Sequence, residues 1–344
     1  HIYINRLPYY VDIYLADKYL DTGKIYLDKA IRFDRNNINE AGYLRQYYIK
    51  KGMKEEADKL LPVLKKRVKN YEYYMERLPE FALLNDSYHE AEAFLNYMET
   101  KPPDIPTRDY MIGNAIENYL SMGFPIRARE LNDENLISGR DTLNYLIRKL
   151  RWEITYGSKD SALSICNQLD KNNPSGIEYL YCRVLFYNLN REYTKALDTA
   201  LKLEGKVLLF SNSVPPDIKV GGFTFFKNGM KEKADYHFKG SIKRAEDEIK
   251  LNSNNARTYN SHFNLALIYA IINDKQKSLQ YLGMIKELQS VPLKFINDLK
   301  TNPMFDNVRN EPEFQKITGE LEKKYLEEHE KIKKLLISHG LEPA

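Results

Sequence analysis

The chain has 344 residues, of which 43% are hydrophobic and 29% are charged, and its formal net charge is +4. This apolar content and small net charge exclude a disordered chain, and the length predicts two compact domains or one elongated repeat array. Apolar residues recur at every third or fourth position rather than alternating, so we expect helices rather than strands. Tyrosine is unusually frequent, with 27 residues, whereas there is one tryptophan.

A small residue followed four positions later by a usually larger one recurs within segments patterned for helix. Successive small residues are 34, 34, 37, 34, 34, 38 and 44 positions apart. The pairs are Gly23 with Leu27, Ala57 with Leu61, Ala91 with Leu95, Ala128 with Asn132, Ala162 with Cys166, Ala196 with Ala200, Ala234 with Phe238, and Ser278 with Leu282. A repeated period of this length is typical of helical hairpins that stack on one another.

Two further residue types keep a fixed distance from the small residue. A glycine precedes it by five positions at Gly52, Gly123, Gly157 and Gly229, and an aromatic residue precedes it by nine positions at Tyr14, Tyr48, Tyr119, Phe225 and Tyr269. Together the three markers resemble the tetratricopeptide repeat over residues 4–290, most closely in the segment 222–238. The resemblance implies an all-α right-handed superhelix of about eight helical hairpins, with residues 1–290 as the repeat array and residues 291–344 as a helical cap.

Departures from the 34-residue period locate irregular segments. Extra residues lie near 102–106 and near Pro215 and Pro216, where proline interrupts helices. Pro62 falls inside an expected second helix of a hairpin and should kink it or end it early. The segment 234–250 is expected to form one unbroken helix that is longer than the usual second helix.

After residue 288 the repeat gives way to a different pattern. Pro303 and Pro312 each stand at an expected helix start, where the missing N–H does no harm and an asparagine can cap. A long amphipathic helix then follows, with apolar residues on one face and mixed Glu and Lys on the other. The apolar residues are Phe314, Ile317, Leu321, Tyr325, Ile332 and Leu335. We expect this helix to cover the last apolar face of the array, with a partner-binding or homodimerising helix as the alternative.

The segment 302–314 is similar to the end of tetratricopeptide arrays in bacterial multidomain signalling proteins. It carries the pattern Asn-Pro-x-Phe-x-x-Val-Arg-x-x-Pro-x-Phe. This resemblance implies the sensory or interaction region of a bacterial regulator. It also implies an output domain upstream of His1, and the missing initiator methionine is consistent with an upstream segment that holds a further domain. No apolar run approaches the roughly 20 residues of a membrane span, so no membrane segment is expected, and the compartment stays open between cytoplasm and periplasm.

Motifs for catalysis and cofactor binding are missing from the sequence. It contains no HExxH, GxSxG, Walker or GxGxxG string, and its two cysteines and six histidines lack metal-ligand spacing. We therefore expect neither an enzyme nor a bound cofactor or metal. Cys166 and Cys182 are expected to be buried thiols, with a disulfide as the alternative, and His237 and His262 to be packing or surface residues. The 52 basic and 48 acidic residues are interspersed, which argues against direct nucleic-acid binding.

The concave side of the array is the best candidate for a binding site. In the family that the chain resembles, the first helix of each unit lines that side at positions three or four apart. The resemblance selects Tyr73, Arg77, Glu80, Tyr110, Asn114, Glu117, Asn144, Arg148, Arg151 and Tyr181. Aromatic anchors, amides and an arginine pair suit a peptide with acidic or C-terminal carboxylate groups. The sequence thus predicts a non-enzymatic protein- or peptide-binding scaffold. The alternatives are an unused solvated face, a sensor that encloses a small ligand, and a self-assembling scaffold.

Overall fold

The structure, a computed structural model, describes residues 13–33, 43–45, 47, 48, 51, 53–60, 116, 119–137, 142–172, 176–207, 218–251, 256, 258–287, 291–338 and 340. These residues form helices and turns, and no β-strand occurs among them. The all-α class that the apolar spacing predicts is therefore confirmed. No helix in the described ranges is both long and apolar enough to cross a membrane.

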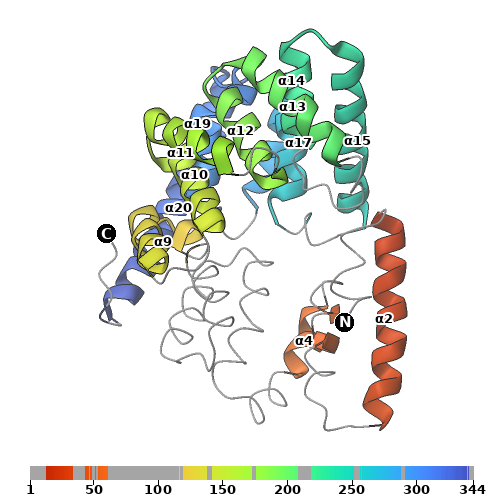
Figure 1. The fold of residues 1–344 in the computed structure, drawn as a ribbon. Helices are drawn as coiled ribbons and strands as arrows, with labels where there is room; N and C mark the ends of the chain where they lie inside the picture. Colours follow the sequence, from red (N-terminus) through yellow and green to blue (C-terminus); the bar gives the residue numbers. More distant parts are fainter. Residues whose placement is uncertain are drawn as a thin grey trace.

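Helices follow one another along the chain in contacting pairs (Figure 1). In chain order they are α2 (Ile13–Phe33), α4 (Lys54–Lys59), α9 (Pro125–Ile137), α10 (Thr142–Tyr156), α11 (Lys159–Asn172), α12 (Ile177–Leu189), α13 (Tyr193–Val207), α14 (Ile218–Lys227), α15 (Lys231–Lys250), α17 (Asn260–Ile271), α18 (Lys275–Ile285), α19 (Leu293–Thr301), the 3-10 helix η3 (Pro303–Phe305) and α20 (Pro312–Ser338). The long helix expected at 234–250 is confirmed, because α15 contains this whole segment and begins three residues earlier.

Contacts between helices run mainly between neighbours in the sequence. Within four hairpins, α10 contacts α11, α12 contacts α13, α14 contacts α15, and α17 contacts α18. The first helix of each hairpin also contacts the first helix of the next, because α10 meets α12, α12 meets α14, and α14 meets α17. An arrangement of this kind buries apolar faces by stacking one hairpin on another.

The small residue of the repeat lies at a crowded position in every described copy. The side chains are at most 1% exposed at Ala57, Ala128, Ala162, Ala196, Ala234 and Ser278, and Gly23 is buried as well. Ser278 satisfies its hydroxyl by donating to the carbonyl oxygen of Ala266 at 2.7 Å. Helices can approach closely only where a side chain this small separates them, which explains why the position stays small. Ala91 lies outside the described residues.

The turn within the hairpins repeats in its backbone geometry even where its sequence changes. The residue five positions before the small one has positive φ at Gly123, Arg191, Gly229 and Asn273, with values of 88°, 61°, 74° and 64°. The next residue's N–H donates to the carbonyl five positions earlier: Phe124 to Tyr119, Glu192 to Tyr187, Met230 to Phe225, and Asp274 to Tyr269, at 2.8–2.9 Å. This bond is typical of a helix that ends in a left-handed residue. The predicted role of glycine at this bend is therefore confirmed at two positions, and arginine and asparagine fill it at two others.

The hairpin of α10 and α11 closes differently. Gly157 has no positive φ, and a Cβ built on it would lie 2.0 Å from Oε2 of Glu153. The N–H of Ser158 donates to the same Glu153 oxygen at 3.1 Å. A carboxylate here replaces the carbonyl acceptor of the other turns, so glycine serves to admit the Glu153 side chain.

The two largest groups of buried side chains between α10 and α20 form most of the core there. The larger group spans α12 to α20 and includes Phe223, Phe225, Phe263, Phe295, Phe305 and Phe314. The ring centroid of Phe263 lies 4.9 Å from that of Phe295 and 5.6 Å from that of Phe305, as in favourable aromatic pairs. The second group joins α10 to α13 and contains both cysteines. Each cysteine is a buried free thiol, so the predicted thiols are confirmed over the alternative disulfide.

The C-terminal segment begins its helices where its prolines predict. η3 starts at Pro303 and α20 at Pro312, and Oδ1 of Asn302 accepts a hydrogen bond of 3.1 Å from the Met304 N–H. The apolar face of α20 buries Phe314, Ile317, Leu321, Tyr325 and Ile332. The prediction for that face is wrong at one residue: Leu335 is only half-buried, and Leu336 is fully buried instead. At 3.6 residues per turn, positions 335 and 336 lie about equally far from the centre of the face that the other five define, on opposite sides of it, so near its end α20 buries the Tyr325 side of the face rather than the Ile317 side.

Helix α20 packs along its own chain rather than extending into solvent. It contacts α18 and α19 near its start, and Figure 1 shows it running from these helices toward α9. There Nδ1 of His329 lies 2.9 Å from the carbonyl oxygen of Met122. Most of the apolar face of α20 is thus buried within the chain.

Candidate functional site

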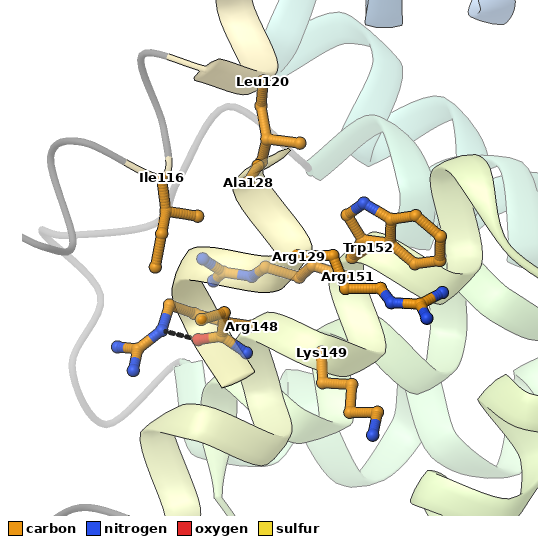
Figure 2. Close-up of a pocket in the computed structure, with 9 residues that line it drawn as sticks. Ile116, Leu120, Ala128, Arg129, Arg148, Lys149, Arg151 and Trp152 are labelled. Atoms are coloured by element: carbon orange, nitrogen blue, oxygen red, sulfur yellow. Dashed lines mark hydrogen bonds between the residues drawn. The ribbon is translucent and has the colours of Figure 1, made fainter. Parts of the chain in front are cut away.

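A small pocket lies between α9 and α10, and cationic side chains surround it. The cavity has a volume of about 30 Å³. Its lining residues are Ile116, Leu120, Ala128, Arg129, Asn132, Arg148, Lys149, Arg151 and Trp152. Figure 2 shows Leu120 and Ala128 on one side of the pocket, Arg148 and Lys149 on the other, and Arg129 and Arg151 between them. We call this site the cationic pocket.

A buried amide orients one of the arginines. Nε of Arg148 donates to Oδ1 of Asn132 at 2.7 Å, and Asn132 is 4% exposed. Asn132 follows Ala128 by four positions, where most other copies of the repeat carry a larger apolar residue. A polar residue in a buried position needs a partner, and here that partner is a guanidinium at the pocket. The hydrogen bond therefore fixes the direction of Arg148 before any ligand arrives.

Trp152 forms an aromatic wall of the pocket and is fixed from two sides. Its indole Nε1–H donates to the carbonyl oxygen of Pro125 at 2.7 Å. The guanidinium of Arg129 lies 5.1 Å from the centroid of the indole ring, within the range of a cation–π contact. Tyr156 lies beside it, with 6.2 Å between ring centroids. The hydrogen bond joins α10 to the first residue of α9.

Two of the pocket's cations have a described carboxylate at the limit of ion-pair distance. Nε of Arg129 is 4.0 Å from Oδ2 of Asp133, and Nη2 of Arg151 is 3.9 Å from Oε2 of Glu178. All four of these side chains are between 44% and 62% exposed, so water weakens the attraction. Lys149 donates instead to the hydroxyl of Tyr145 at 3.2 Å. Among the described residues, these two carboxylates lie on the exposed side of Arg129 and Arg151 rather than in the pocket lining.

Arg151 reaches from the rim of the pocket toward the core behind it. Burial raises the pKa of the Cys182 thiol, and the charge and hydrogen bond of Arg151 offset part of that rise. The guanidinium thus lies close to a neutral sulfur on α12 as well as to Glu178. Contacts on α12 restrict Arg151 on one side while about half of its side chain stays exposed.

The described lining residues of this pocket are cationic, apolar, aromatic and amide side chains, without a carboxylate, histidine, cysteine or hydroxyl group among them. Across the described part of the chain, no group of three His, Cys, Asp or Glu residues could hold a metal ion. Guanidinium and ammonium groups around a small apolar floor are suited to a carboxylate or another small anion.

Of the residues predicted for the concave face, the structure brings two to the pocket. Arg148 and Arg151 both line it. Tyr181 on α12 is half-buried against the core and is not among its lining residues. Asn144 lies in α10. The other predicted residues, Tyr73, Arg77, Glu80, Tyr110, Asn114 and Glu117, lie outside the described residues.

Sequence reasoning missed Arg129, Asn132, Lys149 and Trp152 as parts of the site. Two signals pointed toward them. Trp152 is the one tryptophan of the chain, and Asn132 occupies a position that is large and apolar in most other copies of the repeat. A buried position where a regular pattern turns polar is often functional.

The two histidines expected to be packing or surface residues are half-buried against aromatic rings. His237 stacks on Phe225 with ring centroids 5.3 Å apart, and His262 lies 6.4 Å from Tyr281. Burial lowers the pKa of His262. Both residues are remote in sequence from the cationic pocket and take no part in it.

The chain matches no protein-family profile, and no curated protein is significantly similar to it.

Proposed function

We propose that this chain is a non-enzymatic helical-repeat scaffold of the tetratricopeptide type, which binds an acidic segment of a protein partner at the cationic pocket. The observation that carries the proposal is the gathering of Arg129, Arg148, Lys149 and Arg151 around one cavity beside Trp152. Stacked hairpins with buried small residues support the scaffold. The pattern at 302–314 supports its place in a bacterial regulator. We propose further that the stacked hairpins form a right-handed superhelix.

The size and lining of the pocket favour a carboxylate. A water molecule needs about 10–15 Å³ of such volume, so about 30 Å³ holds two or three small groups. A carboxyl group fits within this space, whereas an aromatic ring does not. Arg148 can present a guanidinium whose direction Asn132 already fixes, and arginine binds carboxylates through two parallel hydrogen bonds. We therefore expect an aspartate or glutamate side chain to enter the pocket, with Trp152 against its aliphatic part.

The single tryptophan makes binding directly measurable. A synthetic peptide of ten residues rich in glutamate should change the emission of Trp152 in a saturable titration, and the same peptide with glutamine in place of glutamate should not. Raising the salt concentration from 0.05 to 0.5 M should weaken binding, because exposed charges are screened. An equal response to both peptides would contradict the proposal.

Removing charge from the pocket tests the assignment. The double variant Lys149→Ala/Arg151→Ala leaves the Arg148–Asn132 hydrogen bond intact and should weaken peptide binding by about tenfold or more, the scale of about 1.4 kcal/mol. The control Lys239→Ala/Lys243→Ala removes the same charge from exposed positions on α15 and should leave the affinity within about twofold. Equal losses of affinity in the two double variants would show that the peptide is attracted by net charge rather than bound at the pocket.

A further inference from the structure

The C-terminal helix rests on the same turn that carries one end of the cationic pocket. On α20, His329 lies over the turn that precedes α9: its ring centroid is 4.5 Å from that of Phe124, and its Nδ1 is 2.9 Å from the carbonyl oxygen of Met122. A carbonyl oxygen can only accept, so Nδ1 carries the hydrogen. The contact between His329 and Met122 joins positions that are 207 residues apart.

Gly123 shows how closely the helix and the turn approach. It has a φ of 88°, and a Cβ placed on it would lie 2.0 Å from Oη of Tyr325 and 2.9 Å from Nδ1 of His329. Tyr325 is itself 7% exposed. Glycine is needed at this position both for its backbone angles and because two side chains of α20 occupy the space of a Cβ.

The turn at 122–124 connects α20 to the pocket through its immediate neighbours in the sequence. The carbonyl oxygen of Pro125 accepts the 2.7 Å hydrogen bond from Trp152 Nε1–H. Pro125 directly follows Phe124, whose ring packs on His329. The carbonyl of Phe124 accepts the N–H of Ala128 at 3.1 Å, which begins α9 and places Ala128 in the pocket lining. Leu120, two residues before Met122, also lines the pocket. The segment 120–128 therefore touches α20 at its centre and the pocket at both ends.

We propose that docking of α20 on this turn holds the cationic pocket in its binding geometry, with His329 as the positioning residue, so that the C-terminal helix controls the acidic-ligand site. The inference rests on the proposed function for its ligand and on the contacts above for its mechanism. Binding and docking must then favour each other reciprocally. An acidic ligand strengthens the docking of α20, and a partner that draws α20 away loosens the pocket.

The first test needs no ligand. Iodide, an anion that collects near cations, should quench the emission of Trp152 to a different extent when α20 is released from the turn. In the full chain, His329→Ala should change the quenching constant by about twofold or more. His329→Asn keeps an amide nitrogen near the place of Nδ1 and should restore at least half of that change. A quenching constant for His329→Ala equal to that of the unsubstituted chain overturns the proposal.

A matched variant separates positioning from simple loss of stability. Ile317→Val shortens a side chain of α20 that is 1% exposed and belongs to the larger core group, away from the turn. It should lower thermal stability without changing iodide quenching at temperatures where the chain is folded. If Ile317→Val changes quenching as much as His329→Ala, α20 acts only through general stability and the proposal fails.

The ligand arm uses the glutamate-rich peptide as the probe. His329→Ala should weaken its binding by about fivefold or more, whereas Ile317→Val should change it by less than twofold. If the unsubstituted chain does not bind the peptide but the quenching arm gives the expected result, the proposed function is wrong and the control of the pocket by α20 stands. Tight peptide binding by His329→Ala, equal to that of the unsubstituted chain, overturns the control.

Discussion

Arg148 on α10 and Asn132 on α9 are joined by a hydrogen bond of 2.7 Å, and the amide that accepts it is 4% exposed. Asn132 stands where the repeat usually carries a larger apolar residue. The two helices therefore give up part of an apolar contact to hold a guanidinium at the rim of the cationic pocket. This exchange is expected where function and packing make different demands on one position.

Replacing the amide by an apolar residue should separate stability from binding. We expect Asn132→Leu to keep or raise the melting temperature, because it restores the apolar pattern of the repeat, and to weaken binding of the glutamate-rich peptide by about fivefold, equivalent to about 1 kcal/mol. Thermal unfolding followed by circular dichroism and titration of Trp152 emission measure the two effects. Asn188, another buried amide, bonds to Thr224 at 2.8 Å. Asn188→Leu should leave peptide affinity unchanged, and a similar loss there would contradict the role of Asn132.

Three glycines should respond in a fixed order to substitution by alanine. Gly229→Ala should cost about 1 kcal/mol, because φ is 74° and no atom lies within 4 Å of the added Cβ. Gly123→Ala should cost more, because a similar φ is combined with a clash against Tyr325. Gly240→Ala, in the interior of α15 with open space around the Cβ, should stabilise by about 0.5–1 kcal/mol. Chemical denaturation gives the three free energies, and a stabilising Gly229→Ala would show that the turn is not strained.

The carboxylate of Asp306 should contribute stability only above acidic pH. Partial burial acts to raise its pKa, but hydrogen bonds from Arg191 and Arg309 outweigh this and lower it. A lowered folded-state pKa means that the contribution is present above the unfolded pKa of about 3.9 and is lost as the pH falls through the folded value. We expect Asp306→Asn to cost about 1 kcal/mol at pH 7, because Arg191 is largely exposed, and less at pH 3.

A control for this prediction is available on the surface. Asp198 pairs with Lys202 at 2.8 Å, and both side chains are more than 60% exposed. Asp198→Asn should change the free energy of unfolding by less than about 0.5 kcal/mol at either pH. If Asp306→Asn costs as much at pH 3 as at pH 7, the effect comes from packing rather than from charge.

Alkaline pH should destabilise the chain partly through a buried thiol. Burial, with smaller electrostatic effects, raises the pKa of Cys166 to about 12 from an ordinary value near 9. A raised folded-state pKa gives stability that is fully present below the unfolded value and lost as the pH rises toward the folded one. The free energy of unfolding should therefore fall between pH 9 and 12, by less in Cys166→Ala than in the unsubstituted chain. Slow alkylation of both thiols at pH 8 under native conditions is the accompanying expectation.

Much of the fold follows from periodicity. The small residues identified from spacing alone are buried in all described copies, and Pro303 and Pro312 begin the helices that they predict. The turns at Arg191 and Asn273 contain no glycine, so a search for glycine cannot find them. At these positions the hydrogen bond of the turn holds the backbone at a left-handed angle, which arginine and asparagine tolerate less well than glycine. Tyr187 supplies the carbonyl of one such bond and was not recognised as part of the aromatic series.

The cationic pocket was predictable only in part. Arg148 and Arg151 lie on one helix and follow from the resemblance, which selects positions three or four apart. Arg129 comes from a different helix, and its approach depends on how α9 packs against α10. The contact of His329 with Met122 has no signal in the repeat, because it joins the C-terminal helix to a turn in the first half of the chain. Long-range contacts of this kind depend on the cumulative orientation of all the hairpins between them.

The contact between His329 and Met122 can form only late in synthesis, after the C-terminal helix has been made. The two residues are 207 positions apart, and ribosomes add roughly 5–20 residues per second. The turn at 122–124 therefore emerges roughly 10–40 s before the helix that covers it. During that interval Phe124 lacks the ring that packs on it, so a chaperone that shields nascent apolar surface would find this turn accessible until the last helix is made.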